Sequence, residues 1–163
     1  MIHLRIDNID IETQEGSTIL VAARNAGIDI PTLCHDERLK PYGSCRMCMV
    51  EVIGRGKFLP ACTTPAVDGI TVFTATPEIK RMRQAVLEML LLHHPLECPV
   101  CDAAGECSLQ DYAHSMGSHT NRFSAKRRDD PVDRRAPLIE INTRRCILCG
   151  KCIRICDEVQ GVH

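Results

Sequence analysis

Eleven cysteines are the residues of this 163-residue chain whose type and spacing could do chemistry. They occur in three groups, and each group contains at least one pair of cysteines separated by two residues. Such pairs are typical of metal and iron–sulfur sites in reduced compartments, whereas disulfides belong mainly to secreted chains. An odd number of cysteines also fits a disulfide framework poorly. We therefore interpret the cysteines as metal ligands.

The first group has the spacing C-x10-C-x2-C-x13-C. Four thiolates can hold two irons that are bridged by two sulfides, although plant-type ferredoxins have four residues between their first two cysteines. A structural zinc site also uses four cysteines, but it usually takes two close pairs and this group has one. The lack of a Cβ at Gly43 lets the chain pass close to the site. We therefore predict a [2Fe–2S] cluster bound by Cys34, Cys45, Cys48 and Cys62.

The second group adds a histidine to three cysteines in the spacing H-x3-C-x2-C-x5-C, formed by His94, Cys98, Cys101 and Cys107. By spacing alone this set could hold either an iron–sulfur cluster or a zinc ion. The competing interpretation of His94 is a histidine at a helix end, where the helix dipole favours it. A neutral imidazole in place of a thiolate removes one negative charge and should raise the reduction potential of a cluster.

The third group is C-x2-C-x2-C-x3-C, which is the cysteine run of bacterial ferredoxins. In such runs the first three cysteines hold one cluster, while the fourth usually binds another. Asp157 follows here, where the ferredoxin pattern has proline. We predict a second [4Fe–4S] cluster on Cys146, Cys149 and Cys152, with Cys156 as a candidate for the fourth ligand.

The elements that position the first group belong to a small α+β unit. The chain has no Trp, two Tyr and three Phe, so a large aromatic core cannot stabilise it and bound metal is expected to help. Strands are predicted at 3–6, 9–12, 49–53 and 70–73, and a helix begins after Ser17 or Thr18 and ends at Gly27. Strand, strand, helix, strand, strand is the order of a β-grasp ferredoxin.

A helix over 77–94, between Pro77 and Pro95, should lead from this domain to the second group. Its apolar stripe is expected to pack in a core, and it consists of Ile79, Met82, Val86, Met89, Leu90 and His93. We predict a further helix over 109–116 and a strand over 138–141. The predicted organisation is a domain over 1–76, a helix with the second group over 77–117, a connector over 118–137 and a ferredoxin-like segment over 138–163.

Composition excludes several functions. The balance of 20 Lys and Arg against 21 Asp and Glu argues against nucleic-acid binding, and the basic run at 126–135 is interrupted by aspartates. The segment 54–57, GRGK, lacks phosphate-loop spacing and predicts a hairpin turn, and no GxGxxG is present. No signal peptide or apolar run of about 20 residues is found. We expect a cytoplasmic chain with no catalytic, flavin or nicotinamide site of its own.

The stretch 94–110, HPLECPVCDAAGECSLQ, closely resembles the large iron–sulfur subunit of NADH:quinone oxidoreductase, or respiratory complex I. Related segments occur in subunits of NAD-linked hydrogenases and formate dehydrogenases. The resemblance covers essentially the whole chain, because the three motifs follow in the family's order. It implies that His94, Cys98, Cys101 and Cys107 bind one [4Fe–4S] cluster, which disfavours zinc at this site.

The resemblance also implies a function, which is the relay of electrons from a flavin-containing NADH-oxidising subunit toward quinone. The partners would include other iron–sulfur subunits, and the complex would place the chain at the cytoplasmic face of the membrane. A hydrogenase or formate dehydrogenase subunit is the alternative, and a zinc-stabilised interaction module is a more remote one. Family members take the fourth ligand of the third site from a cysteine far downstream, so we expect either a fragment or a short subunit completed by Cys156 or a partner, unless that site is degraded or empty.

Overall fold

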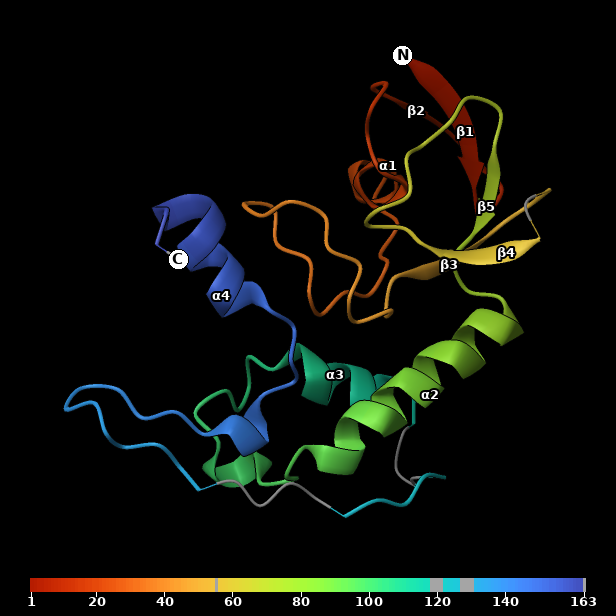
Figure 1. Cartoon of the computed structure of the whole chain (residues 1–163). Coiled ribbons are helices and arrows are strands. Elements are labelled where there is room, and N and C mark those ends of the chain that lie inside the picture. Colours follow the sequence, from red (N-terminus) through yellow and green to blue (C-terminus); the bar gives the residue numbers. More distant parts are fainter. Residues whose placement is uncertain (55, 118–121, 127–130, 163) are drawn as a thin grey trace. The chain divides into compact units, whose positions relative to one another are not determined.

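The computed structural model describes residues 1–54, 56–117, 122–126 and 131–162 (Figure 1). It divides into two compact units. The first unit comprises Met1–Arg83 with Gly150–His163, and the second comprises Gln84–Cys149.

The first unit contains a mixed five-stranded sheet in the order β2-β1-β5-β3-β4. The neighbours β1 and β5 are parallel, and the other pairs are antiparallel. The predicted order of strands and helix is confirmed, with one additional strand, β4. The elements are β1 (Ile2–Ile6), β2 (Ile9–Thr13), α1 (Ile19–Asn25), β3 (Met49–Val52), β4 (Lys57–Pro60) and β5 (Thr71–Phe73).

The turns of the first unit follow the predicted chemistry. Asp7 and Asn8 both have positive φ, at 47° and 68°, as a two-residue hairpin between β1 and β2 requires. The carboxylate of Asp7 also accepts the backbone N–H of Thr74 at 2.8 Å, which ties this turn to the end of β5. The predicted hairpin turn at 54–57 joins antiparallel β3 and β4, although Arg55 lies outside the described residues.

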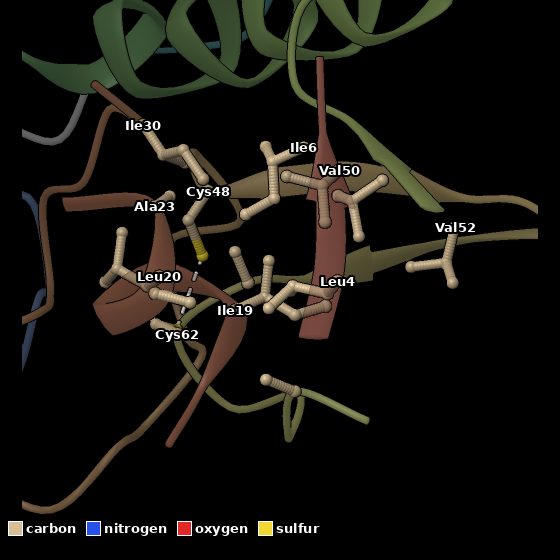
Figure 2. Packing of buried hydrophobic residues seen from close by; sticks show 14 of the residues in the cluster. Leu4, Ile6, Ile19, Leu20, Ala23, Ile30, Cys48, Val50, Val52 and Cys62 are labelled. Atoms are coloured by element: carbon tan, nitrogen blue, oxygen red, sulfur yellow. Dashed lines mark hydrogen bonds between the residues drawn. The ribbon is translucent and has the colours of Figure 1, made fainter. Parts of the chain in front are cut away.

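Aliphatic side chains form the core of the first unit, where α1 packs against the sheet (Figure 2). Thr18 caps α1 by accepting the N–H of Val21, so the helix begins where its apolar residues Ile19 and Leu20 enter the core. Figure 2 shows Cys48 and Cys62 among these side chains. The core is therefore continuous with the first group of cysteines.

Helix α2 (Pro77–His93) confirms the predicted helix, but part of its predicted buried stripe is wrong. Met89 is 50% exposed, whereas the buried positions include Arg83 and Glu88 beside Ile79 and Leu87. Both charged residues have partners that make their burial possible. The guanidinium of Arg83 donates to the carbonyl oxygens of Met47 and Met49, each at 3.0 Å.

The second unit holds short helices connected by loops. The 3-10 helix η1 (Cys98–Val100) precedes α3 (Ser108–Ser115), which confirms the predicted second helix, and the 3-10 helix η2 (Thr143–Arg145) lies before the last cysteines. The predicted strand over 138–141 is wrong. Only an isolated bridge joins Ile141 to Asp133, and Leu138 is 94% exposed, so no described neighbouring strand completes a ladder.

The C-terminal residues of the first unit form α4 (Lys151–Ile155) and the π-helix η3 (Cys156–Gln160). Parts of the predicted connector and of its basic run, at 118–121 and 127–130, lie outside the described residues. Among the described helices, none combines the length and the apolar composition that crossing a membrane requires.

Candidate iron–sulfur centres

The first group of cysteines is gathered where the long loop after α1 meets the ends of two neighbouring strands. Cys34 and Cys45 lie in that loop, Cys48 immediately precedes β3, and Cys62 follows β4. Cys34, Cys48 and Cys62 are each 1% exposed. The structure therefore brings all four predicted residues into the same buried part of the first unit.

Two pairs of sulfur contacts define this group. The Sγ atoms of Cys48 and Cys62 are hydrogen-bonded at 3.3 Å. The backbone N–H of Cys45 donates to Sγ of Cys34 at 3.4 Å. Two sulfurs that bind one tetrahedral metal at about 2.3 Å lie about 3.8 Å apart. The Cys48–Cys62 pair is thus already close to the spacing that one iron requires.

The backbone around the group is fixed by hydrogen bonds and by positive φ angles. The N–H of Ala61 donates to the carbonyl of Cys48 at 2.9 Å, and the N–H of Leu20 donates to the carbonyl of Ala61 at 3.0 Å. Gly43 has a φ of +70°, and a Cβ at this position would lie 3.1 Å from Cγ2 of Thr63. The close approach predicted at Gly43 is therefore to the residue that follows Cys62.

Electrostatics within each pair favour one thiolate. The contact between the two thiol side chains of Cys34 and Cys45 lowers the pKa of Cys45 to about 5, and the corresponding side-chain contact with Cys62 lowers the pKa of Cys48 to about 7. The same contacts, followed by burial, raise the pKa of Cys34 and Cys62. Metal binding requires deprotonated thiols, and in each pair one thiol is easier to deprotonate than the other.

The second group lies entirely in the second unit. His94 follows the last residue of α2, Cys98 begins η1, Cys101 follows that helix, and Cys107 is the N-cap of α3. These four residues line one small cavity together with Arg145 and Gln110. A neighbouring cavity of about 210 Å³ is lined by His94, Cys98 and Cys107 and by apolar side chains from α2 and α3.

The imidazole of His94 has the properties of a metal ligand. Burial, followed by the positive charge of Arg145, lowers the pKa of His94 and so favours the neutral form that binds metals. Its Nδ1 atom is buried and has no hydrogen-bond partner among the described residues. The same is true of Nδ1 of His93, but His94 is the histidine that lines the cavity with the cysteines.

The four candidate ligands of the second group line one cavity. Among the described residues, no three His, Cys, Asp or Glu side chains are arranged to hold a single metal ion. A zinc site would bring its ligands to about 2.0–2.3 Å from one centre. One imidazole and three thiols are a donor set that both a zinc ion and an iron–sulfur cluster accept. The buried Nδ1 of His94, which has no hydrogen-bond partner among the described residues, and the three partly buried thiols are donors that such a metal group can use.

The third group is divided between the two units. Cys146 and Cys149 belong to the second unit, whereas Cys152 in α4 and Cys156 in η3 belong to the first. The N–H of Leu148, which has a φ of +55°, donates to Sγ of Cys146 at 3.3 Å. Such a turned N–H is typical of backbone that faces cluster sulfurs. The assembly of Cys146, Cys149 and Cys152 into one site, with or without Cys156, stays a prediction.

Arg145 is the residue of the second site that sequence reasoning missed. It precedes Cys146 in the third motif, so its position in the sequence associates it with another group of cysteines. The available signal was the placement of a basic residue beside a cysteine motif, which is common on protein surfaces. A three-dimensional arrangement is needed to place Arg145 beside Cys98 and Cys101.

The comparisons with known proteins match both regions. Residues 1–77 match the family described as a 2Fe-2S iron-sulfur cluster binding domain, and residues 83–122 match the NADH-ubiquinone oxidoreductase-G iron-sulfur binding region. The chain is 47% identical over 163 residues to an NADH-quinone oxidoreductase G subunit of Rhizobium meliloti, covering 99% of this chain and 19% of that protein.

Two further relatives have different electron donors or acceptors in their names. The chain is 43% identical over 163 residues to NADPH-Fe(3+) oxidoreductase subunit alpha of Geobacter sulfurreducens, covering 100% of this chain and 19% of that protein. A crystal structure of NAD+-reducing [NiFe]-hydrogenase in the H2-reduced state matches with a TM-score of 0.89 and 34% identity, covering 98% of this chain and 67% of that one. The chain spans about a fifth to a quarter of the curated relatives.

Proposed function

This chain belongs to the family of NADH-quinone oxidoreductase G subunits, whose N-terminal part it matches, and from that membership we propose that it relays single electrons through bound iron–sulfur clusters. The electrons would come from a flavin-containing NADH-oxidising subunit and leave, through other iron–sulfur subunits, toward quinone. The observation that supports the proposal is that the fold gathers two separate sets of four candidate ligand residues. The chain would have no catalytic site of its own and would reach the cytoplasmic face of the membrane only through its partners.

The first proposed centre is a [2Fe–2S] cluster in a β-grasp domain over 1–76. The contacts support a pairing in which Cys34 and Cys45 hold one iron, while Cys48 and Cys62 hold the other. The aliphatic core around Cys48 and Cys62 would keep water from the cluster. Low solvent exposure is one of the factors that set the reduction potential of such a cluster.

The second proposed centre is a [4Fe–4S] cluster in the segment 77–117, held by His94, Cys98, Cys101 and Cys107. The shared cavity and the unpartnered Nδ1 of His94 support this assignment. The neutral imidazole leaves the site one negative charge short of an all-cysteine site. That difference favours the reduced form of the cluster and should raise its reduction potential.

A connector over 118–137 and a ferredoxin-like segment over 138–163 complete the proposed organisation. The segment would bind a second [4Fe–4S] cluster through Cys146, Cys149 and Cys152. Its fourth ligand would be Cys156 or a group outside these 163 residues. Clusters supply the electron-accepting chemistry, and the role of the chain is to fix their positions, exclude water and set their potentials.

Spectroscopy of the purified chain after anoxic reconstitution tests the proposal. We expect iron and acid-labile sulfide, with electron paramagnetic resonance signals of both a [2Fe–2S] and a [4Fe–4S] cluster after reduction. Cys62→Ser should remove only the first signal, and His94→Ala should remove or alter only the second. His93→Ala is the matched control and should preserve both signals. A colourless, folded protein that contains zinc and no sulfide would refute the proposal.

A subunit of an NAD-linked hydrogenase or formate dehydrogenase is the second candidate. The structural likeness to the NAD+-reducing [NiFe]-hydrogenase favours this alternative as far as the described residues extend. The native complex should be purified through this chain and assayed with quinone, hydrogen and formate. Turnover of hydrogen or formate without quinone reduction would support this second candidate over the first.

A further inference from the structure

Arg145 contributes a partly buried cation to the cavity of the second group. Its side chain is 26% exposed, and it lines the same cavity as His94, Cys98, Cys101 and Cys107. The residue reaches this place at the end of η2, which begins after Asn142. The side chain of Asn142 caps η2 by accepting the N–H of Arg144 at 3.2 Å.

The outer end of the guanidinium is held by acceptors on the neighbouring loop. Nη2 of Arg145 donates to the carboxylate of Glu97 and to the carbonyl of Val100, each at 3.4 Å. Nη1 lies 3.9 Å from the carboxylate of Asp102. These acceptors lie in the loop that carries Cys98 and Cys101, so they fix the guanidinium beside those cysteines.

The inner nitrogen of the same group is left without an acceptor. Nε of Arg145 is buried and makes no hydrogen bond among the described residues. A buried N–H without an acceptor is destabilising, so such groups usually have a partner in the functional state. The cavity that Arg145 lines is the place where the proposed cluster would supply sulfur acceptors.

We propose that Arg145 tunes the second cluster by directing its Nε–H and its positive charge at the cluster sulfurs, which stabilises the reduced state. The inference depends on the [4Fe–4S] cluster proposed for this site. Reduction adds one negative charge to the cluster, and a nearby cation and hydrogen-bond donor favour that charge. Arg145 is thus a positioning and tuning residue, since the ligands remain the histidine and the three cysteines.

This arrangement also gives the second and third sites a shared structural element. Arg145 is covalently adjacent to Cys146, the first proposed ligand of the third site. The ion contacts with Glu97 and Asp102 therefore hold the start of the third motif against the loop of the second. A change at Arg145 should act mainly on the potential of the second cluster, because the residue lines the cavity of the second group.

The test is a redox titration of the reconstituted chain, followed by electron paramagnetic resonance of both clusters. We expect Arg145→Gln to lower the reduction equilibrium constant of the [4Fe–4S] cluster about tenfold or more, which corresponds to about 59 mV for a one-electron couple. Arg145→Lys keeps the charge and loses the Nε–H, so its shift should have the same sign and a smaller size. The potential of the [2Fe–2S] cluster should stay unchanged in both variants.

Arg135→Gln is the matched control, because Arg135 is 91% exposed, belongs to the same unit and pairs with Asp133. Its [4Fe–4S] potential should equal that of the unmodified chain. A loaded Arg145→Gln variant with an unchanged potential would overturn the inference. If that variant does not load, an unchanged potential in Arg145→Lys overturns it instead. Absence of the [4Fe–4S] signal from the unmodified chain would count against the cluster itself, so the two failures are distinguishable.

Discussion

The two sites that gather four ligands differ in what surrounds them. In the first unit, three of four cysteines are 1% exposed, and Cys48 and Cys62 belong to an aliphatic core made by a sheet and a helix. In the second unit, the three cysteines are partly exposed and stand on a 3-10 helix, a loop and a helix N-terminus. We infer from this comparison that the protein itself holds the loop between Cys34 and Cys48, whereas the loop over 95–107 would depend on the cluster proposed for it.

Removal of iron by a chelator under anoxic conditions should have the largest effect, and it should affect the two units differently. Without its cluster, the segment 95–107 should open with a free energy of about 0 kcal/mol, as frayed segments do. The amides of β1, β3 and β5 should change their opening free energy by about 1 kcal/mol or less, because the core persists. Hydrogen exchange followed by mass spectrometry measures both, and equal loss of protection in sheet and loop would contradict the comparison.

Arg83 tests whether the protein holds the first loop. Its guanidinium donates to the carbonyls of Met47 and Met49, on either side of Cys48, and the residue is 6% exposed. Arg83→Met should cost about 3 kcal/mol, because the carbonyls lose charged donors in a buried place. Arg81→Met is the control and should cost about 1 kcal/mol or less, since Arg81 is exposed and pairs with the exposed Glu78 one helical turn away.

Urea unfolding of the first unit, monitored by far-ultraviolet circular dichroism, measures these free energies. Reconstitution should then show a reduced [2Fe–2S] content for Arg83→Met and an unchanged [4Fe–4S] signal. If the two arginine variants unfold at the same urea concentration, Arg83 does not support the loop.

Gly43 tests the close approach within the first site. Both Gly43 and Gly27 have a positive φ, at +70° and +74°, so alanine should cost about 1–2 kcal/mol at either position. A Cβ at Gly43 would also lie 3.1 Å from Thr63, whereas a Cβ at Gly27 has nothing within 4 Å. Gly43→Ala should therefore be the more destabilising variant in urea and the one that lowers [2Fe–2S] loading, and equal loading in both would show that the contact with Thr63 is unimportant.

Local signals in the sequence were sufficient to predict most of the secondary structure of the first unit. The turn at Asp7 and Asn8, the cap at Thr18 and the termination at Gly27 each reflect a preference of the backbone at one position, which a sequence displays directly. Strand β4 was missed because it is four residues long and ends at Pro60, which is unusual in a strand. The candidate ligands were predicted from their spacing and, for the second group, also from the family resemblance. The fold gathers the first eight of them in two places.

Tertiary contacts explain the remaining errors. The apolar periodicity of α2 could not indicate that Arg83 and Glu88 would be buried, because their partners come from distant segments. The alternating residues at 138–141 indicated a strand, but a strand forms only where another strand pairs with it. Arg145 belongs to the same class, since its role depends on a loop 48 residues away in the sequence.

The smallest expected effect concerns a support that the first site receives from the C-terminal residues of the same unit. Glu158 accepts the N–H of Lys40 at 2.8 Å, and the guanidinium of Arg154 lies 4.7 Å from the ring centroid of Tyr42. Lys40 and Tyr42 belong to the loop between Cys34 and Cys45. The hydrogen bond from the N–H of Lys40 is the main cause that lowers the pKa of Glu158. Burial acts in the opposite direction, and the contacts with Arg154 lower the pKa further.

The pKa of Glu158 is lower in the folded chain than in the unfolded one. The ionised carboxylate therefore contributes fully to folding stability above its unfolded pKa of ~4.3, and this contribution is lost as the pH falls through its folded pKa. Protection of the Lys40 amide from exchange, corrected for intrinsic rates, should decline over that acidic range. Glu158→Gln should lose this pH dependence, whereas Glu37→Gln, at an exposed carboxylate on the same loop, should retain it. Protection that stays constant in the unmodified chain would mean that the loop is held by Arg83 and the core without help from the C-terminal helix.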